Sequence, residues 1–228
     1  MSAIHPNLQN LILAAEALAP LESDIVFVGG ATAILYADDR DNSSPRATID
    51  VDCIVEVASY LEYHKVEAKM RTIGFNHDVS EEAPICRWKK GPLIVDLMPT
   101  DEKILGFSNR WYQKGFSTSQ KQQLPEGTSI SVFTFPLFIA TKLEALLSRG
   151  VKDLLTSQDL EDILFVMDSR KNFTADMRKA SDDVLNFVRE SFLKVSKMQD
   201  FEQAVNGNMP RGLVVERQNQ ILNMFTAI

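Results

Sequence analysis

The alternation of apolar and polar positions divides the chain into a first part of mixed helices and strands and a second part that is helical. Apolar residues recur at helical spacing from about Asn7 to Leu18 and from about Ser59 to Ile73, which predicts two amphipathic helices. A shorter helix is expected from Ala31 to Tyr36. Short apolar runs bounded by turn residues predict strands at 24–28, 49–55, 85–88, 93–97 and 129–133.

Polar segments separate these elements. The strands at 85–88 and 93–97 flank Lys89-Lys90-Gly91-Pro92, and the turn chemistry of this break predicts a β-hairpin. The stretch 38–46 has the composition of an exposed loop, and residues 100–127 are irregular and locally basic.

The helical character begins near Pro136, which lies in the first turn of a helix that ends before Gly150. Further helices are expected at 160–167, 177–195 and 213–225, with 205–210 as a connector. We therefore predict an α/β (α+β) fold in two parts, a mixed core at 1–134 and a helical subdomain at 135–228.

Composition and charge narrow the class of protein. A chain of 228 residues with 45% hydrophobic and 24% charged content is globular in composition. The net charge of −7 argues against a protein that coats nucleic acid, because such binding neutralises phosphates with Lys and Arg. Two cysteines without metal-ligand spacing, no secretory signal and no long apolar run lead us to expect a soluble protein in a reducing cytoplasm.

The first candidate chemistry is an acid doublet. Asp50 and Asp52 alternate with apolar residues, so on a strand both carboxylates project from one face, where they could hold one cation between two oxygens. With 31 acidic residues in the chain, about four such pairs are expected by chance. A solvated strand face is the alternative, but the apolar flanks would bury the acids, and buried carboxylates need a partner.

Asp96 is a third acid in the same kind of setting, because it is the only charge in an apolar strand. Alone it is equally consistent with a salt bridge or a strand end. Together with the doublet it gives three carboxylates, and oxygen ligands suit Mg²⁺ (or Mn²⁺) shared with substrate phosphates.

A glycine pair lies between the first strand and the helix that follows. Gly29 and Gly30 leave backbone N–H groups at a helix start, where phosphate can bind, although a plain tight turn explains the pair equally well. The hydroxyl of Thr32 could contact a ligand or cap the helix.

These motifs together resemble the polymerase-β-like nucleotidyltransferase superfamily, and within it the AbiEii/AbiGii-type toxin-like group. The resemblance covers roughly residues 20–165. It rests on four segments in order: Val28-Gly29-Gly30-Ala31-Thr32-Ala33, Arg46-Ala47-Thr48-Ile49-Asp50-Val51-Asp52, Val95-Asp96-Leu97, and Lys142-Leu143-Glu144-Ala145-Leu146 with Arg149, Lys152 and Asp153.

The resemblance implies roles for these residues. Asp50 and Asp52 would bind Mg²⁺, Asp96 would complete the site and act as general base, and the two glycines would contact the triphosphate of an NTP. Lys142 would contact phosphate with Arg149 in support, although a solvated helix face is the alternative for both. Arg46 would either contact the NTP or orient one acid of the doublet. The later acidic role falls to Asp153 first, with Asp159 and Asp162 as the alternatives.

These observations lead to a metal-dependent nucleotidyltransferase as the main hypothesis. The acceptor could be an RNA end such as that of a tRNA, a protein or a small molecule such as an antibiotic, and the toxin-like resemblance adds an antitoxin protein as a partner. A basic middle segment that includes Arg87, Lys89 and Lys90 leaves room for RNA. The alternative hypothesis is a catalytically silent module that binds a nucleotide or a protein. The three histidines lack ligand spacing, so we expect structural roles for them.

Overall fold

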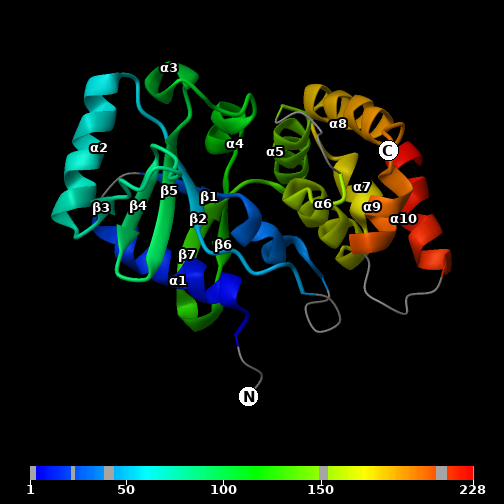
Figure 1. Cartoon of the computed structure of the whole chain (residues 1–228), viewed down its shortest axis with the longest axis horizontal. Coiled ribbons are helices and arrows are strands. Elements are labelled where there is room, and N and C mark those ends of the chain that lie inside the picture. Colours follow the sequence, from blue (N-terminus) through cyan, green and yellow to red (C-terminus); the bar gives the residue numbers. More distant parts are fainter. Residues whose placement is uncertain (1–3, 22–23, 39–43, 149–153, 209–214, 228) are drawn as a thin grey trace. The chain divides into compact units, whose positions relative to one another are not determined.

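The computed structural model describes residues 4–21, 24–38, 44–148, 154–208 and 215–227. The chain divides into two compact units: unit 1 contains residues 1–32 and 47–134, and unit 2 contains residues 33–46 and 135–228. Unit 1 is built on a mixed β-sheet, and the described elements of unit 2 are helical (Figure 1). The α/β fold class predicted from the sequence is confirmed. The segment 33–46 belongs to unit 2, although the sequence pattern placed it in the first part.

The sheet of unit 1 has seven strands in the order β3-β4-β5-β2-β1-β7-β6. The pairs β2–β5 and β1–β7 are parallel, and the other neighbours are antiparallel. The sheet is therefore mixed, in agreement with the mixed core that the sequence predicts. Its strands are β1 (Ile25–Val28), β2 (Val51–Val55), β3 (Asn76–His77), β4 (Arg87–Lys90), β5 (Leu93–Pro99), β6 (Gln120–Gln123) and β7 (Ser129–Val132).

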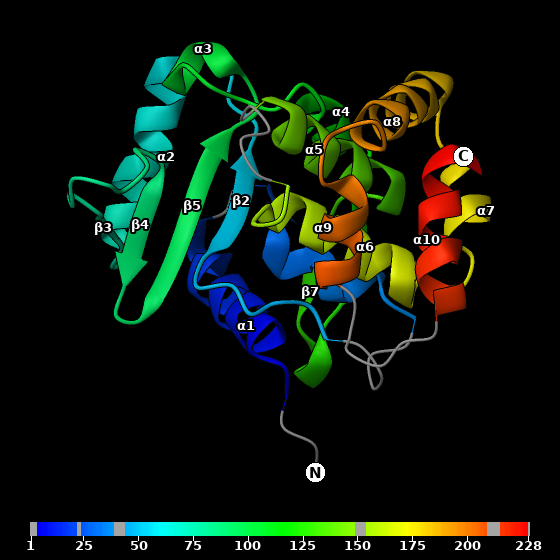
Figure 2. The same ribbon diagram turned by 45° about the vertical axis from the view of Figure 1, so that its right-hand side comes forward.

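Helices support this sheet. The first of them, α1, contacts β2 and β5 (Figure 2), and the Tyr63 hydroxyl of α2 donates a hydrogen bond to the Leu97 carbonyl of β5 at 2.8 Å. The 3₁₀ helix η2 (Gly30–Tyr36) begins in unit 1 and continues into unit 2. The remaining elements are α1 (Pro6–Leu18), η1 (Ala19–Leu21), α2 (Tyr60–Thr72), α3 (Glu102–Leu105), α4 (Tyr112–Ser117) and η3 (Pro125–Gly127).

Unit 2 packs its helices around aromatic side chains. The Phe192 ring lies 4.5 Å from that of Phe225, and the Tyr36 ring of η2 lies 4.6 Å from that of Phe138. Its helices are α5 (Phe135–Ser148), α6 (Gln158–Ser169), α7 (Phe173–Met177), α8 (Asp182–Val195), α9 (Phe201–Asn208) and α10 (Val215–Ala227). Among the described residues, no helix is both long and apolar enough to cross a membrane.

Several boundaries differ from the sequence prediction. Residues 100–127 contain α3, α4, β6 and η3 instead of irregular chain, because elements of three to six residues are too short to show periodicity. The helix expected at 177–195 breaks between α7 and α8, and α9 occupies most of the expected connector at 205–210. The strand expected at 49–55 begins only at Val51, so Asp50 precedes the strand.

Candidate active site

A row of polar side chains crosses the centre of the sheet. Arg87 of β4 lies opposite Asp96 of β5, and Asp96 lies opposite Asp52 of β2. Directly opposed residues point to the same face of a sheet, so these three side chains share one face. Asp52 in turn lies opposite Val28, the last residue of β1, so the row ends at the Gly29-Gly30 turn. We call Asp50, Asp52, Asp96 and Arg87 the carboxylate row.

Arg87 binds two carboxylates of this row at once. Its Nε donates to Asp96 Oδ1 at 2.8 Å and its Nη2 donates to Asp96 Oδ2 at 2.7 Å, which is a bidentate pair. The same Nη2 donates to Asp50 Oδ2 at 2.5 Å. The hydrogen bonds to Asp96 raise the pKa of Arg87 above its already high ordinary value, so the guanidinium stays charged. Two carboxylates thus converge on one cationic nitrogen.

Asp50 is presented to Arg87 by a short segment that α1 holds in place. The Thr48 hydroxyl donates to the Asp50 carbonyl at 3.1 Å, and the Thr48 N–H donates to the side-chain oxygen of Asn7 at 2.9 Å. Asn10 adds a hydrogen bond to the Thr48 carbonyl at 3.1 Å. Asn7 is fully buried, so this polar contact fixes the segment before β2. Asn7 is a positioning residue that the apolar pattern of the first helix does not reveal.

Gly29 lets the carboxylate of Asp52 approach the backbone. Its φ of +73° lies in the left-handed region that favours glycine. A Cβ on Gly29 would lie 1.9 Å from Oδ2 of Asp52. The space that a side chain would need is therefore filled by the acid, which gives the first glycine a steric role in the carboxylate row.

The turn after Gly29 differs from the helix start that the sequence predicts. The element η2 is a 3₁₀ helix, and the Thr32 hydroxyl donates to the Gly29 carbonyl at 2.8 Å. Thr32 is buried and its N–H also donates to the Gly29 carbonyl, at 3.3 Å. In this structure the Thr32 hydroxyl closes the turn as a donor, whereas a helix cap would accept from a backbone N–H.

The apolar surroundings of the row are buried on one side and open on the other. Val51 and Cys53 are buried, as the sequence predicts, but Ile49 is 75% exposed. The apolar flank of Asp50 therefore does not bury it, and the Asp50 side chain is 26% exposed, against 8% for Asp96. A ligand from solvent can reach the row from the Asp50 side.

The two cysteines beside the row are not nucleophiles. Burial, followed by the nearby charges of Asp52 and Asp96, raises the pKa of the Cys53 thiol. Burial is also the largest cause that raises the pKa of Cys86 to about 12. Both shifts disfavour the thiolate, which is the nucleophilic form of cysteine.

Lys142, a predicted phosphate-binding residue of the helical part, lies in a second cluster, within unit 2. Lys142 of α5 places its Nζ 3.1 Å from Asp159 Oδ1 and 2.6 Å from Asp162 Oδ2. Arg46 Nε lies 3.3 Å from Asp162 Oδ1. We call these four residues the buried charge cluster, because the side chains of Lys142, Asp159 and Asp162 are exposed by only 9, 8 and 1%.

The buried charge cluster shows where several predicted site residues lie. Arg46, expected to contact the NTP or to orient an acid of the doublet, forms ion pairs with Asp162 and, at 3.9 Å, with Glu161. Lys142 is buried and not on a solvated face. Its acidic partners are Asp159 and Asp162, the residues ranked after Asp153. Arg149, Lys152 and Asp153 lie outside the described residues.

The oxygen donors of the carboxylate row are of the kind that bind a divalent metal ion, but in this structure two of the carboxylates bind the Arg87 guanidinium. Carboxylate oxygens are the donors that Mg²⁺ and Mn²⁺ take, and the convergence of Asp50 and Asp96 on one nitrogen marks a position for positive charge. Among the described residues, however, no group of three or more His, Cys, Asp or Glu side chains is arranged to hold a metal ion. In this structure the position between Asp50 and Asp96 is taken by the Arg87 guanidinium.

Two histidines converge on one buried acid elsewhere in unit 1. His64 Nδ1 lies 2.6 Å from Glu67 Oε2, and His77 Nε2 lies 3.4 Å from Glu67 Oε1. Burial is the largest cause that lowers the pKa of His77. The charge of Glu67 raises this pKa and the charge of Arg71 lowers it, each by a smaller amount. His64 and Glu67 meet through their i,i+3 spacing on α2, whereas the contact of His77 with Glu67 depends on tertiary packing, which the sequence pattern does not reveal.

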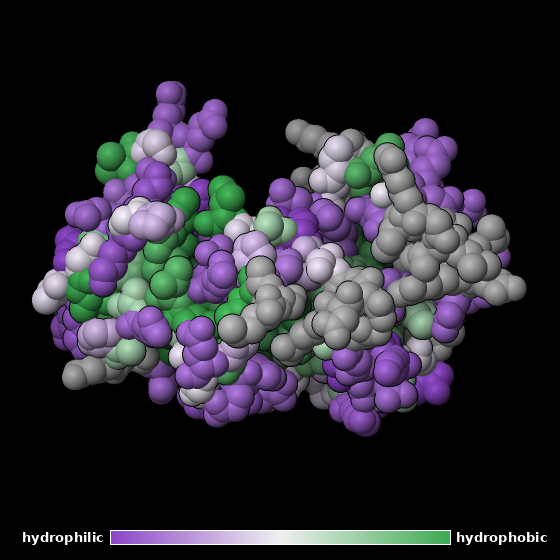
Figure 3. Space-filling view, turned by 90° about the horizontal axis from the view of Figure 1, so that it is seen from below, coloured by the Kyte–Doolittle hydropathy of each residue, from purple (hydrophilic) through white to green (hydrophobic). Residues whose placement is uncertain are grey.

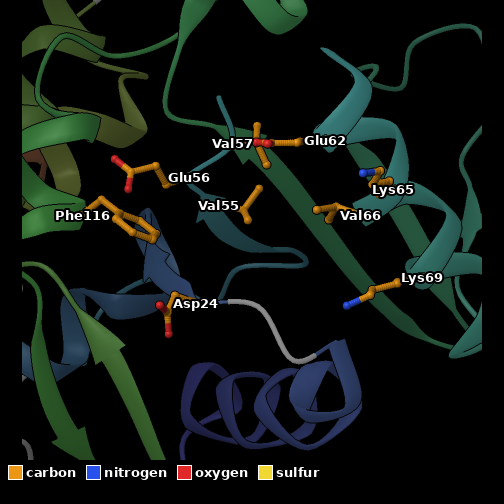
Figure 4. Close-up of a pocket in the computed structure, with 9 residues that line it drawn as sticks. All are labelled: Asp24, Val55, Glu56, Val57, Glu62, Lys65, Val66, Lys69 and Phe116. Atoms are coloured by element: carbon orange, nitrogen blue, oxygen red, sulfur yellow. The ribbon is translucent and has the colours of Figure 1, made fainter. Parts of the chain in front are cut away.

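A separate hollow of about 350 Å³ opens at the far end of β2 (Figure 4). Val55 reaches it three residues after Asp52, about 10 Å further along the strand. Two of its charged groups have partners: Lys69 donates to the Leu21 carbonyl and Glu62 accepts from the Ala58 N–H. The hollow contains none of the predicted site residues. Its lining is Asp24, Val55, Glu56, Val57, Glu62, Lys65, Val66, Lys69 and Phe116.

The surface of unit 1 also carries exposed apolar side chains. On the face seen in Figure 3, apolar surface on the unit 1 side lies between polar groups. The exposed apolar residues of this unit include Ile49 and Ile85, which are neighbours in sequence of Asp50 and of the Cys86-Arg87 pair.

Comparison with known proteins supports the fold. No protein-family model and no curated protein sequence matches this chain. A candidate nucleotidyltransferase from H. pylori, known from its crystal structure, is 14% identical, covers 97% of this chain and 92% of its own, and superposes with a TM-score of 0.50. A nucleotidyltransferase-like antigenic protein from Paracoccidioides brasiliensis is 13% identical over 96% of this chain and 92% of its own, with a TM-score of 0.44. At this identity the H. pylori protein shows the fold alone: the chain has a nucleotidyltransferase-like fold.

Proposed function

We propose that this chain is a metal-dependent nucleotidyltransferase whose centre is the carboxylate row. The observation that carries the proposal is the alignment of Asp52 with Asp96 across two neighbouring core strands, beside the glycine that Asp52 packs against. The nucleotidyltransferase-like fold supports it, although fold alone does not decide function. The substrates are an NTP and an acceptor that carries a hydroxyl or a phosphate.

In the proposed reaction the acceptor oxygen attacks the α-phosphorus of the NTP. The bond between the α-phosphorus and the bridging oxygen breaks, and pyrophosphate leaves with that oxygen. A divalent cation held by Asp50, Asp52 and Asp96 would supply neutralisation of the phosphate charge. When the acceptor is a hydroxyl, its proton passes to Asp96. Both oxygens of Asp96 accept hydrogen bonds from Arg87 in this structure, so Arg87 competes with that proton.

The test is transfer of label from NTP to an acceptor. Purified protein is incubated with Mg²⁺, bacterial RNA or lysate, and each NTP labelled at the α-phosphorus. We expect a labelled macromolecule with at least one NTP, no label from the same NTP labelled at the γ-phosphorus, and no transfer in EDTA. Asp52→Asn removes one charge with little change of shape, and we expect it to reduce transfer at least about 100-fold. Transfer that survives this substitution would place the reaction elsewhere.

A second candidate function is a nucleotide-binding module without catalysis. The observation in its favour is Arg87, which already neutralises Asp50 and Asp96. Such a module should bind an NTP equally well in EDTA and should release no pyrophosphate with any acceptor. The nucleotidyltransferase should bind Mn²⁺ and NTP together and either one weakly alone, because the metal is held largely through substrate phosphates. Isothermal titration with and without EDTA separates the two.

The AbiEii-type resemblance extends the proposal to a toxin that an antitoxin protein controls. We expect expression without an antitoxin to slow bacterial growth, and Asp52→Ala to relieve the effect at equal protein level. Normal growth with the wild-type chain would instead support a housekeeping or antibiotic-modifying enzyme, and drug resistance on expression would favour the latter.

A further inference from the structure

Arg87 occupies the place in the carboxylate row where positive charge is needed. Its Nη2 lies 2.5 Å from Asp50 Oδ2 and 2.7 Å from Asp96 Oδ2, so a single nitrogen bridges two acids from different segments. The backbone of Arg87 is fixed in the β4–β5 hairpin, where its N–H donates to the Pro84 carbonyl at 2.9 Å. Its side chain is 18% exposed. The guanidinium can therefore leave toward solvent while the strand stays in place.

We propose that Arg87 is a resident counter-ion that holds the carboxylate row together without a metal and moves off it when a divalent cation and an NTP bind. This inference rests on the proposed function, because it assumes that the row is the metal site. A second positive charge at the same oxygens would be repelled by the guanidinium. Bound metal and the Arg87 ion pairs thus exclude one another.

The nucleotide offers Arg87 a new partner. A guanidinium fork binds phosphate oxygens with the same two-point geometry that it uses for a carboxylate. When an NTP arrives with its metal, Arg87 can exchange Asp50 and Asp96 for phosphate, and no charge is left without a partner. Arg87 would then couple the two binding events, so that each ligand raises the affinity for the other.

A purely structural ion pair is the competing explanation, and metal affinity separates the two. The full-length protein is titrated with Mn²⁺ alone, and free Mn²⁺ is followed by electron paramagnetic resonance. We expect Arg87→Gln to bind Mn²⁺ at least about tenfold more tightly than the wild type, because the competing charge is gone. The titration is repeated with α,β-methylene NTPs, and the factor by which they tighten Mn²⁺ binding should shrink at least about threefold in the variant.

Lys89→Gln is the matched control. Lys89 lies two residues further along β4 and pairs with Asp78 at 2.6 Å, outside the carboxylate row. Lys89→Gln changes the net charge by the same amount as Arg87→Gln but removes no contact of the carboxylate row. We therefore expect it to leave the Mn²⁺ affinity unchanged. Adding Asp52→Asn to Arg87→Gln should abolish the gained affinity if the ion binds at the row.

Arg87→Lys covers the case in which Arg87→Gln fails to fold. Lysine keeps the charge but lacks the two-point fork, so we expect Mn²⁺ affinity between those of the wild type and the Gln variant. Folded variants that bind Mn²⁺ no more tightly than the wild type would overturn the inference. Label transfer by the wild type alongside that result would leave the proposed function intact. Tighter Mn²⁺ binding by the variants, without label transfer by the wild type, would support the inference and count against the proposed function.

Discussion

The buried charge cluster and the carboxylate row contain similar residues but differ in burial and in charge balance. In the buried charge cluster, two cations meet two carboxylates, and Asp162, whose side chain is 1% exposed, contacts both Lys142 and Arg46. In the carboxylate row, one arginine serves acids that are open to solvent on the Asp50 side. The first cluster balances its formal charges among its members, whereas the four members of the row sum to −2.

This difference indicates which cluster can exchange an ion-pair partner at lower cost in free energy. Removing one partner from a fully buried ion pair leaves an uncompensated charge in a medium that solvates it poorly, so such a cluster resists exchange. A partly exposed pair loses little when it opens, because water replaces the partner. The contrast is consistent with the row as the proposed ligand site, and three substitutions test it in order of decreasing effect.

The largest effect is expected from Asp162→Asn. It removes the acid shared by Lys142 and Arg46, and we expect a loss of roughly 3–5 kcal/mol in unfolding free energy. The melting temperature should fall by roughly 6–20 °C. Asp50→Asn, made in the exposed part of the row, should change the unfolding free energy by about 1 kcal/mol or less. Equal losses in thermal denaturation would erase the distinction between the two clusters.

An intermediate effect is expected from Gly29→Ala. Alanine at position 29 must adopt the left-handed backbone conformation, and its Cβ must displace the carboxylate of Asp52. We therefore expect a loss of about 1–3 kcal/mol in unfolding free energy and weaker Mn²⁺ binding. Gly74→Ala is the control, because Gly74 also has positive φ but a Cβ there meets only the end of Lys90 at 3.5 Å. If both variants bind Mn²⁺ like the wild type, Gly29 has only a backbone role.

The smallest effect is expected from Lys89→Gln and appears as a change in pH dependence. The hydrogen bond from Lys89, with a second from Ser80, lowers the pKa of Asp78 to about 2. Because the folded pKa lies below the ordinary value of 3.8, this stabilisation is present above that value and is lost as the pH falls toward 2. We expect the Asp78 pKa to rise in the variant, as measured by carboxyl NMR. The wild type and the variant should therefore differ in stability above pH 4 and converge in stronger acid, and an unmoved Asp78 pKa would contradict the assignment.

The sequence predicted the carboxylates of the row but not their partner. Asp52 and Asp96 stand in apolar strands, which is a strong local signal, whereas Arg87 is one of several basic residues in the middle segment. The pairing of Arg87 with Asp96 follows from the register of the β4–β5 hairpin. The observed turn contains only Gly91 and Pro92, so Lys90 pairs with Leu93 and Arg87 therefore faces Asp96. The predicted hairpin has Lys89 and Lys90 in the turn, and this difference of two residues hides the pairing of Arg87 with Asp96.

Other contacts could not be predicted because they depend on tertiary packing. Asn7 holds Thr48 from a helix whose periodicity shows only its apolar face. Arg46 adjoins the acid doublet in sequence but pairs with Asp162, 116 residues away. Helical spacing gave the existence of α5 and α6, and the ion pairs of Lys142 follow only once those two helices are packed together.

The most direct test of the account is the position of Mn²⁺ in crystals grown with an α,β-methylene NTP. We predict an anomalous scattering peak beside Asp52 and Asp96, with the Arg87 guanidinium turned away from both Asp50 and Asp96. A peak at Asp159 and Asp162 of the buried charge cluster would contradict the account, as would a nucleotide bound without metal while Arg87 keeps its present contacts.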